Sequence, residues 1–569
     1  MRDVLIIGGG PGGSTVASFL KLYKPNLDVL VLEREKFPRD HVGESQLPPI
    51  GPILNEMGCW DKVEAANFPI KIGATFRWGN TRDLWDFQLY PAELFVDEPR
   101  PGKFKGQRMH TAWQVDRSIY DEILLDHSAS LGAEVREETK VTEILRDGDK
   151  ITGVKLEDGT VETARYYVDA SGSSGFMRRA MGIDIVEPST LRNVAFWDYW
   201  VDTEWAYSIG TGGTRIQVLS LGYGWMWFIP IGETRTSIGL VCPADYFKNC
   251  GMTKEELYDK ALADEPLISE LIKDAKRDNV IRATRDWSYY AERMHGENWF
   301  LVGEAAGFAD PILSAGLTMA HIGGKELALT IMALDEGKLD AEWLKGELDE
   351  NQTRRVKQHI QFADFWYTAN GCFTDCKEYT SVIAKEVGLS LTAHDAFQWF
   401  GSGGFIHENL GAGFSGCEFD TMKDTIEVLT QTTATLECQK YNHFTLNLEG
   451  ATVEEFAIYD RGKVISVNRW RRGNETLPQS GLYFVIVQLL QHRSDLPFVF
   501  GQMAKAVMDK GLRNTIEGGL VFGLGYMESM VRAGWVIGKL DPSITTLEFE
   551  FPKLQAGIRM NDDTFVEAK

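Results

Sequence analysis

Residues 3–33 read DVLIIGGGPGGSTVASFLKLYKPNLDVLVLE, and this stretch decides the fold. A short apolar run at 4–7 leads directly into glycines, and an apolar helical face follows. A second apolar run at 28–32 ends at Glu33. Strand, helix and strand within about thirty residues predict a β-α-β unit, and therefore a parallel sheet in an α/β protein.

The glycines of this stretch predict a dinucleotide site. Gly8, Gly10 and Gly13 form a GxGxxG pattern between strand and helix, where bare backbone can approach a pyrophosphate at the helix N-terminus. Glu33, twenty residues after Gly13, is placed to accept hydrogen bonds from a ribose. We include Ser14 among the binding residues, and the alternative is a plain glycine turn.

Further along the chain, apolar and aromatic patterns predict a second sheet. Residues 72–115 and 185–245 read as strands rich in aromatic side chains, and 298–302 as one more buried strand. We therefore expect a Rossmann-like domain over residues 1–345 with this sheet interleaved. Residues 346–569 are expected to be mainly helical, with less certain strands near 455–470, and to cover the substrate pocket.

Composition excludes several function classes. Lys and Arg number 59 against 82 Asp and Glu, a net charge of −23, which disfavours nucleic acid as a partner. The seven cysteines form no CxxC pair, so no metal site is expected and a reducing, cytoplasmic location is favoured. The apolar stretch 518–538 contains Glu528 and Arg532, so we expect no membrane span.

Two later segments favour FAD over a nicotinamide cofactor. NWFLVGEAAGFADP at 298–311 and DASG at 169–172 resemble fingerprints of the p-hydroxybenzoate-hydroxylase-like flavoproteins. This resemblance implies that family's fold, FAD as cofactor, and binding of the ribityl chain by Asp310.

The segment GWMWFIP at 224–230 indicates the reaction, because it resembles the WxWxIP motif of flavin-dependent halogenases. That resemblance implies that Trp225 and Trp227 crowd the space between flavin and substrate. The alternative is an aromatic strand in an ordinary sheet core.

A second halogenase match surrounds Lys71. NFPIKIGATFRWG at 67–79 resembles the segment with the family's active-site lysine. The resemblance implies that FADH2 and O2 give a C4a-hydroperoxide, that halide attacks it, and that hypohalous acid passes to Lys71. An ammonium would polarise this acid, whereas a neutral amine would form a haloamine. The alternative is an ordinary surface lysine.

Three more segments resemble the same family: FPRDHVGES at 37–45, QVDR at 114–117 and PILSAG at 311–316. They add Arg39, Ser45 and Arg117 near the cofactor. They also add Ala315 and Gly316, whose backbone amides would hold the halide.

Leu313 stands where tryptophan halogenases have a glutamate, so the resemblance favours the phenol and pyrrole branch. The expected function is thus FADH2-dependent halogenation of an electron-rich aromatic substrate, either free or tethered to a carrier protein. A separate reductase would supply FADH2, since no second GxGxxG is visible. Alternatives are an aromatic hydroxylase and a non-catalytic flavin-binding protein.

Two segments allow two interpretations each. The basic residues between Arg461 and Arg472 would either dock an acidic carrier or form a solvated face. The aromatic stretch 361–367 would either roof the substrate pocket or pack in the core. The sequence leaves halide preference and oligomeric state open.

Overall fold

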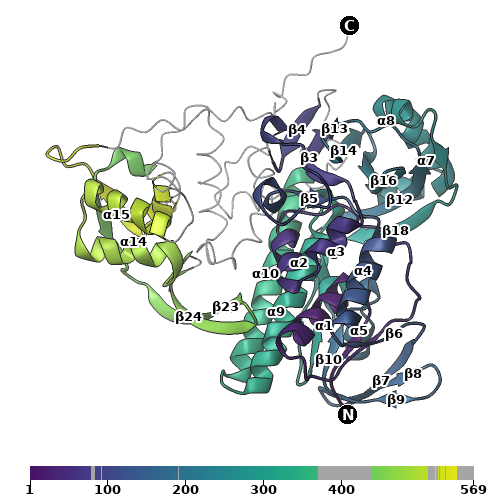
Figure 1. Ribbon diagram of the computed structural model, residues 1–569, viewed down its shortest axis with the longest axis horizontal. Helices are drawn as coiled ribbons and strands as arrows, with labels where there is room; N and C mark the ends of the chain where they lie inside the picture. The colour runs from purple at the N-terminus through teal and green to yellow at the C-terminus, as the bar shows by residue number, and fades with distance from the viewer. Residues whose placement is uncertain are drawn as a thin grey trace, which may run out of the picture.

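A computed structural model describes residues 1–78, 84–90, 92–189, 191–368, 437–473, 475–509, 520, 523–524, 526–528, 530–531 and 533–546 (Figure 1). The predicted β-α-β unit is confirmed as β1 (Arg2–Ile7), α1 (Pro11–Tyr23) and β2 (Val29–Leu32). Together with β6 (Glu134–Arg136), β10 (Ala164–Asp169) and β20 (Trp299–Leu301), they form a parallel sheet of order β20-β10-β1-β2-β6.

The register of this sheet collects the cofactor segments at one edge. Ile7 pairs with Leu32 on one side and with Asp169 on the other, so all three strands end together. Parallel strands present their following loops at that same end. The glycine turn, Glu33 and the DASG segment are therefore neighbours.

The predicted second sheet is also present, with ten strands and the path β17-β12-β16-β15-β14-β3-β4. Its central strands are almost wholly buried. Its members are β3 (Ile70–Arg77), β4 (Trp85–Gln88), β5 (Ala112–Trp113), β12 (Arg192–Val201), β13 (Ser208–Ile209), β14 (Gly213–Leu221), β15 (Gly224–Pro230), β16 (Arg235–Pro243), β17 (Lys276–Arg277) and β18 (Arg282–Trp287).

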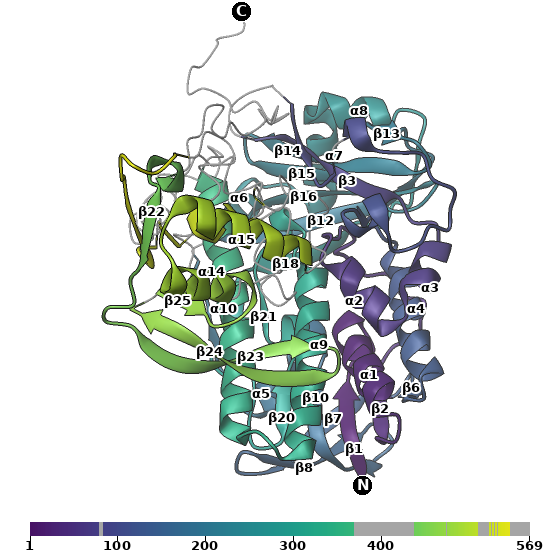
Figure 2. The same cartoon turned by 60° about the vertical axis from the view of Figure 1, so that its left-hand side comes forward.

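Helices and short sheets cover the two large sheets (Figure 2). The helices are α2 (Ile50–Met57), α3 (Trp60–Ala65), α4 (Arg117–Ser130), α5 (Phe176–Ala180), α6 (Ala244–Asn249), α7 (Lys254–Asp264), α8 (Pro266–Leu271) and α9 (Gly316–Glu336). The 3-10 turns are η1 (Ala92–Leu94), η2 (Gly106–Met109), η3 (Gly172–Ser174), η4 (Gly303–Ala305) and η5 (Pro311–Leu313). The small sheets comprise β7 (Val141–Asp147), β8 (Lys150–Leu156) and β9 (Val161–Glu162), and β11 (Ile185–Val186), β19 (Tyr289–Ala291) and β21 (Gly307–Phe308).

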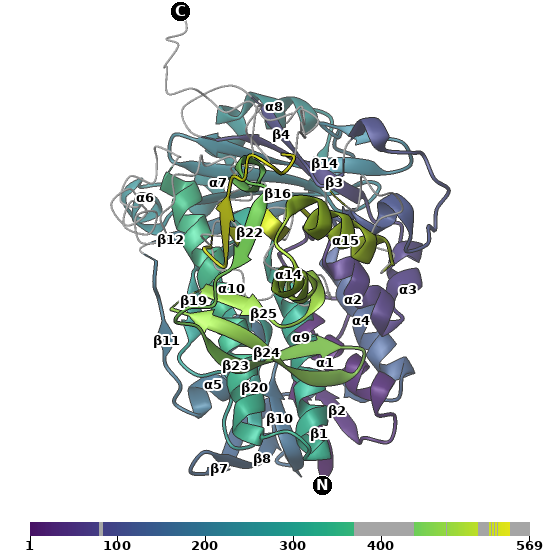
Figure 3. The same ribbon diagram turned by 90° about the vertical axis from the view of Figure 1, so that its left-hand side faces the viewer.

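The C-terminal region begins with α10 (Ala341–Thr368), which packs beside α9. The strands expected near 455–470 are present as β23 (Thr452–Asp460) and β24 (Lys463–Arg472), and this hairpin crosses α9 and α10 (Figure 3). The remaining elements are η7 (Glu437–Lys440), β22 (His443–Leu446), β25 (Glu475–Pro478), α14 (Gly481–His492), α15 (Leu496–Asp509) and β26 (Val536–Lys539). The expected boundary at 345 falls inside α10, and the division into domains stays a prediction.

In the part of the chain that the structure describes, no helix is both long and apolar enough to span a membrane.

Candidate active site

The glycine turn after β1 is shaped so that side chains are excluded. Gly8 has φ of +107°, and a Cβ built there would lie 2.3 Å from the carbonyl oxygen of Ala170. A Cβ on Gly13 would lie 2.0 Å from the Gly8 oxygen. Gly10 is the N-cap of α1, and the Ser14 hydroxyl donates to the Gly9 oxygen at 2.7 Å. The tight turn thus points the N-terminus of α1 at the sheet edge, where an anionic group is favoured.

Glu33 is buried beside this turn. Its Oε2 accepts the Gly9 N–H at 2.7 Å, and its Oε1 accepts the Glu35 N–H at 2.9 Å. A carboxylate has about four acceptor positions, so two remain for the hydroxyls of a ribose.

Arg39 and Arg117 meet on one buried carboxylate. Arg117 donates to both oxygens of Asp121, at 2.7 and 2.8 Å, and Nη1 of Arg39 lies 3.4 Å from the same group. Arg117 also donates to the carbonyl oxygen of Val42 at 3.0 Å. Asp121 raises the pKa of Arg117 although burial opposes this, so the guanidinium stays charged and fixes the 37–45 segment against α4.

Asp310 is the N-cap residue of η5. Its Oδ1 accepts the Ile312 N–H at 2.8 Å and the Tyr367 hydroxyl at 3.1 Å. The chain then turns through Ser314, with φ of +55°, and α9 begins at Gly316.

The start of α9 has the features of an anion site. This helix has 21 residues and no acidic residue in its first turn. The first N–H groups of a helix have no intrahelical partner and carry its positive dipole end. The amides of Ala315 and Gly316 are at this end of α9, and their role in halide binding stays a prediction.

Unpartnered polar atoms between the two sheets fit a polar, planar cofactor. Ser45 and Gln114 pair through an isolated antiparallel bridge. The Ser45 hydroxyl and both polar atoms of the Gln114 amide are buried and have no hydrogen-bond partner among the described residues. Buried polar groups are normally satisfied, so this place fits a ligand with donors and acceptors, such as a flavin ring.

Lys71 is a buried residue of β3, 2% exposed, and its Nζ donates to the carbonyl oxygen of Gln46 at 3.0 Å. Burial lowers the pKa of this ammonium from 10.5 to about 7. The surface-lysine alternative is thereby excluded. Gln46 follows Ser45 directly, so the lysine is tied to the segment expected beside the flavin.

Trp225 and Trp227 lie on one face of β15, with ring centroids 6.0 Å apart. Trp225 Nε1 donates to the Tyr367 hydroxyl at 2.9 Å, and Trp227 Nε1 donates to the Ser237 hydroxyl at 3.0 Å. Tyr367 in turn donates to Asp310. One hydrogen-bond chain therefore joins Trp225 to Asp310, the ribityl-binding candidate.

Sequence reasoning missed two residues of this site. Glu44 is buried, accepts from the Gly43 N–H at 3.1 Å and from the Tyr199 hydroxyl at 3.3 Å, and also interacts with Ser237. Burial raises the pKa of its carboxyl to about 6. Its charge within an otherwise uncharged VGES motif was the available signal.

Tyr367 was the other residue not singled out; it belongs to the aromatic stretch 361–367, for which a pocket roof and core packing were both left open. Its side chain is fully buried and reaches the active site from α10. The side chain of Leu313 lies outside the described residues, so the exclusion of the tryptophan branch that rests on it stays a prediction.

Comparison with known proteins decides the family. The sequence profile described as tryptophan halogenase matches residues 3–90 and 87–373. The chain belongs to the tryptophan halogenase family. Its relatives include 1H-pyrrole-2-carbonyl-[peptidyl-carrier protein] chlorinase of Pseudomonas fluorescens, 31% identical over 391 residues, which are 65% of this chain and 85% of the relative. Sulochrin halogenase gedL of Aspergillus terreus is 32% identical over 386 residues, 62% of this chain and 67% of the relative.

One solved structure is similar in fold over nearly the full length of both chains. The flavin-dependent halogenase CmlS aligns with a TM-score of 0.70 over 98% of this chain and 99% of its own, at 24% identity, which supports the fold alone. The FAD-dependent chondrochloren halogenase CndH is 28% identical and aligns with a TM-score of 0.59 over 71% of this chain and 96% of its own. Together with the family match and the named relatives, it confirms the predicted enzyme class, a flavin-dependent halogenase of aromatic substrates with FAD as cofactor.

Proposed function

We propose that this halogenase makes hypohalous acid beside the start of α9 and transfers the halogen through Lys71 to a phenolic or pyrrolic ring. When bound, FADH2 would supply with O2 the oxidant that the halide requires. The amides of Ala315 and Gly316 hold that halide. A separate reductase supplies the FADH2, and cytoplasmic location is part of the proposal, supported by the free thiols of the four described cysteines.

The single observation that carries the proposal is the burial of Lys71. A pKa of about 7 leaves much of the amine neutral at neutral pH. A neutral amine attacks the halogen of hypohalous acid, forming an N–halogen bond, and the hydroxyl leaves with the amine proton as water. The remaining ammonium population supports the other mechanism, in which Lys71 donates a hydrogen bond to the acid. The 3.0 Å contact with Gln46 holds Nζ in place in both cases.

Trp225 and Trp227 favour halogenation of the substrate over its direct hydroxylation at the flavin. Both indoles are nearly fully buried and each is fixed by a hydrogen bond from its N–H. Rigid rings between flavin and substrate would exclude direct contact, so the halogen must travel by way of Lys71. This arrangement supports halogenation over direct hydroxylation.

A free phenolic or pyrrolic substrate fits better than a carrier-tethered one. The basic segment that could dock a carrier is partly paired within the chain, because Arg469 and Arg471 both pair with Glu454. Arg472 stacks over the Trp535 ring at 4.3 Å and donates to a backbone carbonyl. These three arginines are therefore engaged within the chain rather than presented to an acidic partner.

Lys71→Ala tests the proposal. We expect flavin oxidation to continue and halogenated product to fall to the background level, since the oxidant is still made but not delivered. Lys62→Ala, at an exposed lysine of α3, is the matched control and should keep full product. Full product from Lys71→Ala would refute the role of Lys71, and hydroxylated product would favour a monooxygenase.

A further inference from the structure

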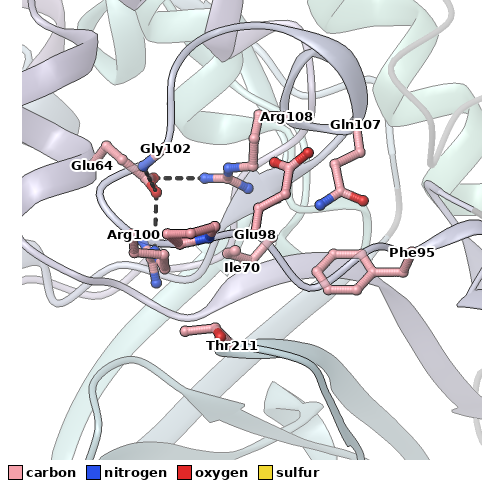
Figure 4. Close-up of a pocket in the computed structure, with 10 residues that line it drawn as sticks. Glu64, Ile70, Phe95, Glu98, Arg100, Gly102, Gln107, Arg108 and Thr211 are labelled. Carbon is pink, nitrogen blue, oxygen red and sulfur yellow. Dashed lines mark hydrogen bonds and ion pairs between the residues drawn. The ribbon is translucent and has the colours of Figure 1, made fainter.

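A buried polar network surrounds Glu64 of α3. Its carboxylate accepts hydrogen bonds from Arg100, Arg108 and the Gly102 N–H (Figure 4). These residues all lie between positions 64 and 108 of the chain, so this network stabilises one local segment. A second buried network, centred on His321 of α9, joins helices that are far apart in sequence.

His321 contacts hydroxyl groups of two other helices. Its Nδ1 lies 2.8 Å from Oγ1 of Thr15 in α1, and its Nε2 lies 2.7 Å from the hydroxyl of Tyr120 in α4. The two contacts span 306 and 201 residues of the sequence. All three side chains are 0% exposed. A hydroxyl can donate or accept, so both ring nitrogens are satisfied whichever of them carries the proton.

The imidazole of His321 is neutral. Burial lowers its pKa from 6.5 to about 3. A neutral ring has one donor and one acceptor, and the two hydroxyls supply a partner for each. The ring therefore keeps both contacts at neutral pH, and its low pKa disfavours a role as general acid or base there.

Each member of this network lies close to the end of its helix that carries predicted site residues. Thr15 follows the glycine turn, Tyr120 follows Arg117, and His321 follows Gly316 by about a turn and a half of helix. A displacement of α9 at His321 is therefore transmitted to the start of the same helix.

The contact between α1 and α9 needs such a bond to define one position. The two helices lie side by side (Figure 2). A Cβ built on Gly324 of α9 would lie 3.0 Å from both the Gly12 oxygen and the Thr15 Cβ. A smooth contact of this kind tolerates sliding of one helix along the other, whereas a buried polar pair is satisfied in a single register. The Thr15–His321 bond fixes where α9 begins relative to the glycine turn.

We propose that His321 is a positioning residue that holds the halide-binding start of α9 in register with the glycine turn of α1. This inference rests on the proposed function, in which the amides of Ala315 and Gly316 hold the halide. A shift of α9 along α1 moves these amides relative to the flavin site and weakens their contacts with the halide. His321 acts through the helix and needs no contact with halide or flavin.

Two variants remove the bond from its two sides. His321→Leu removes the ring, and Thr15→Val removes only a hydroxyl and keeps the shape of the side chain, so its folding is secure. The halide KM should rise about tenfold or more in both, the effect of weakening one hydrogen bond to an ion. FADH2 oxidation without halide should keep its wild-type rate. The double variant should have the halide KM of His321→Leu alone, because both changes break the same bond.

A binding measurement provides a readout besides turnover. Bromide is titrated into the oxidised, FAD-loaded enzyme, and the absorbance of the bound flavin reports its dissociation constant. This constant should rise in both variants by the same factor as the halide KM.

His127→Leu and Ser18→Ala are the matched controls. His127 is a buried histidine of α4 whose Nε2 donates to the Met57 carbonyl oxygen at 2.9 Å. Ser18 follows Thr15 by about one helical turn, and its buried hydroxyl has no partner among the described residues. His127→Leu should lower the melting temperature, as His321→Leu does, but leave the halide KM unchanged. Ser18→Ala should leave both unchanged.

An unchanged halide KM in Thr15→Val and His321→Leu, with halogenated product from the wild type, would overturn this inference alone. A rise of the same size in His127→Leu, or an equal loss of halide-free flavin oxidation, would also overturn it, since either result indicates general damage to the site. A wild-type enzyme without any halide-dependent product would refute the proposed function, and this inference with it.

Discussion

Replacing Lys71 by Met should stabilise this halogenase at neutral pH while abolishing its product. The Lys71 pKa falls from 10.5 to about 7 because burial penalises the ammonium. The pKa difference is about 3.5 units, and each unit corresponds to about 1.4 kcal/mol. Burial of Lys71 therefore lowers the free energy of unfolding by about 5 kcal/mol at pH 7. Methionine removes that cost but leaves the Gln46 carbonyl unsatisfied, which costs about 1–3 kcal/mol. We expect a net gain of about 2–4 kcal/mol.

The pH dependence identifies the origin of that gain. Between pH 7 and 10.5 the unfolded wild-type chain binds one more proton at Lys71 than the folded chain does, so wild-type stability rises with pH. The advantage of Lys71→Met should therefore shrink by about 1.4 kcal/mol per pH unit and vanish before pH 10. Urea unfolding of both proteins at about pH 7, 8 and 9 measures this difference in the free energy of unfolding. A loss of stability of equal size at every pH would refute the burial of an uncharged amine.

Three further changes test other parts of the site. Gly13→Ala places a Cβ against the Gly8 oxygen and should abolish FAD retention, measured by absorbance after gel filtration. Ala315→Pro removes one backbone donor at the start of α9 and should raise the halide KM about tenfold or more, since a hydrogen bond to an ion is worth about 1.5–3 kcal/mol; an unchanged KM would exclude this amide. Tyr367→Phe leaves the Trp225 N–H without its acceptor and should lower the ratio of product to flavin oxidised, whereas an unchanged ratio would mean that Trp225 needs no such support.

The fold was predictable where the determining interactions are local. The turn after β1 requires glycine at Gly13 because of the carbonyl oxygen of nearby Gly8, and Glu33 reaches Gly9 as soon as the two strands pair. The contact that excludes a side chain at Gly8 comes instead from Ala170, which is distant in sequence. The second sheet was predictable from the alternating apolar and aromatic residues of its strands. In the C-terminal region a mainly helical structure and less certain strands near 455–470 were expected, and these strands are adjacent in sequence and pair with each other as β23 and β24.

The missed parts of the site depend on contacts between distant residues. Trp225 and Tyr367 are separated by 142 residues, and Glu44 and Tyr199 by 155. The pKa values of Lys71 and Glu44 are set by burial, which no motif reports. The sequence identifies the chemical groups of the site. Only the folded structure shows which of them are buried and which hydrogen-bond partners they have.

The measurement that tests the central claim most directly is product analysis with each halide in turn. The purified enzyme receives FAD, a flavin reductase, NADH, and a panel of phenols, pyrroles and indoles, and mass spectrometry reads the halogen isotope patterns. We expect a halogenated phenol or pyrrole that disappears when halide is omitted. A hydroxylated product that forms equally well without halide would contradict the account.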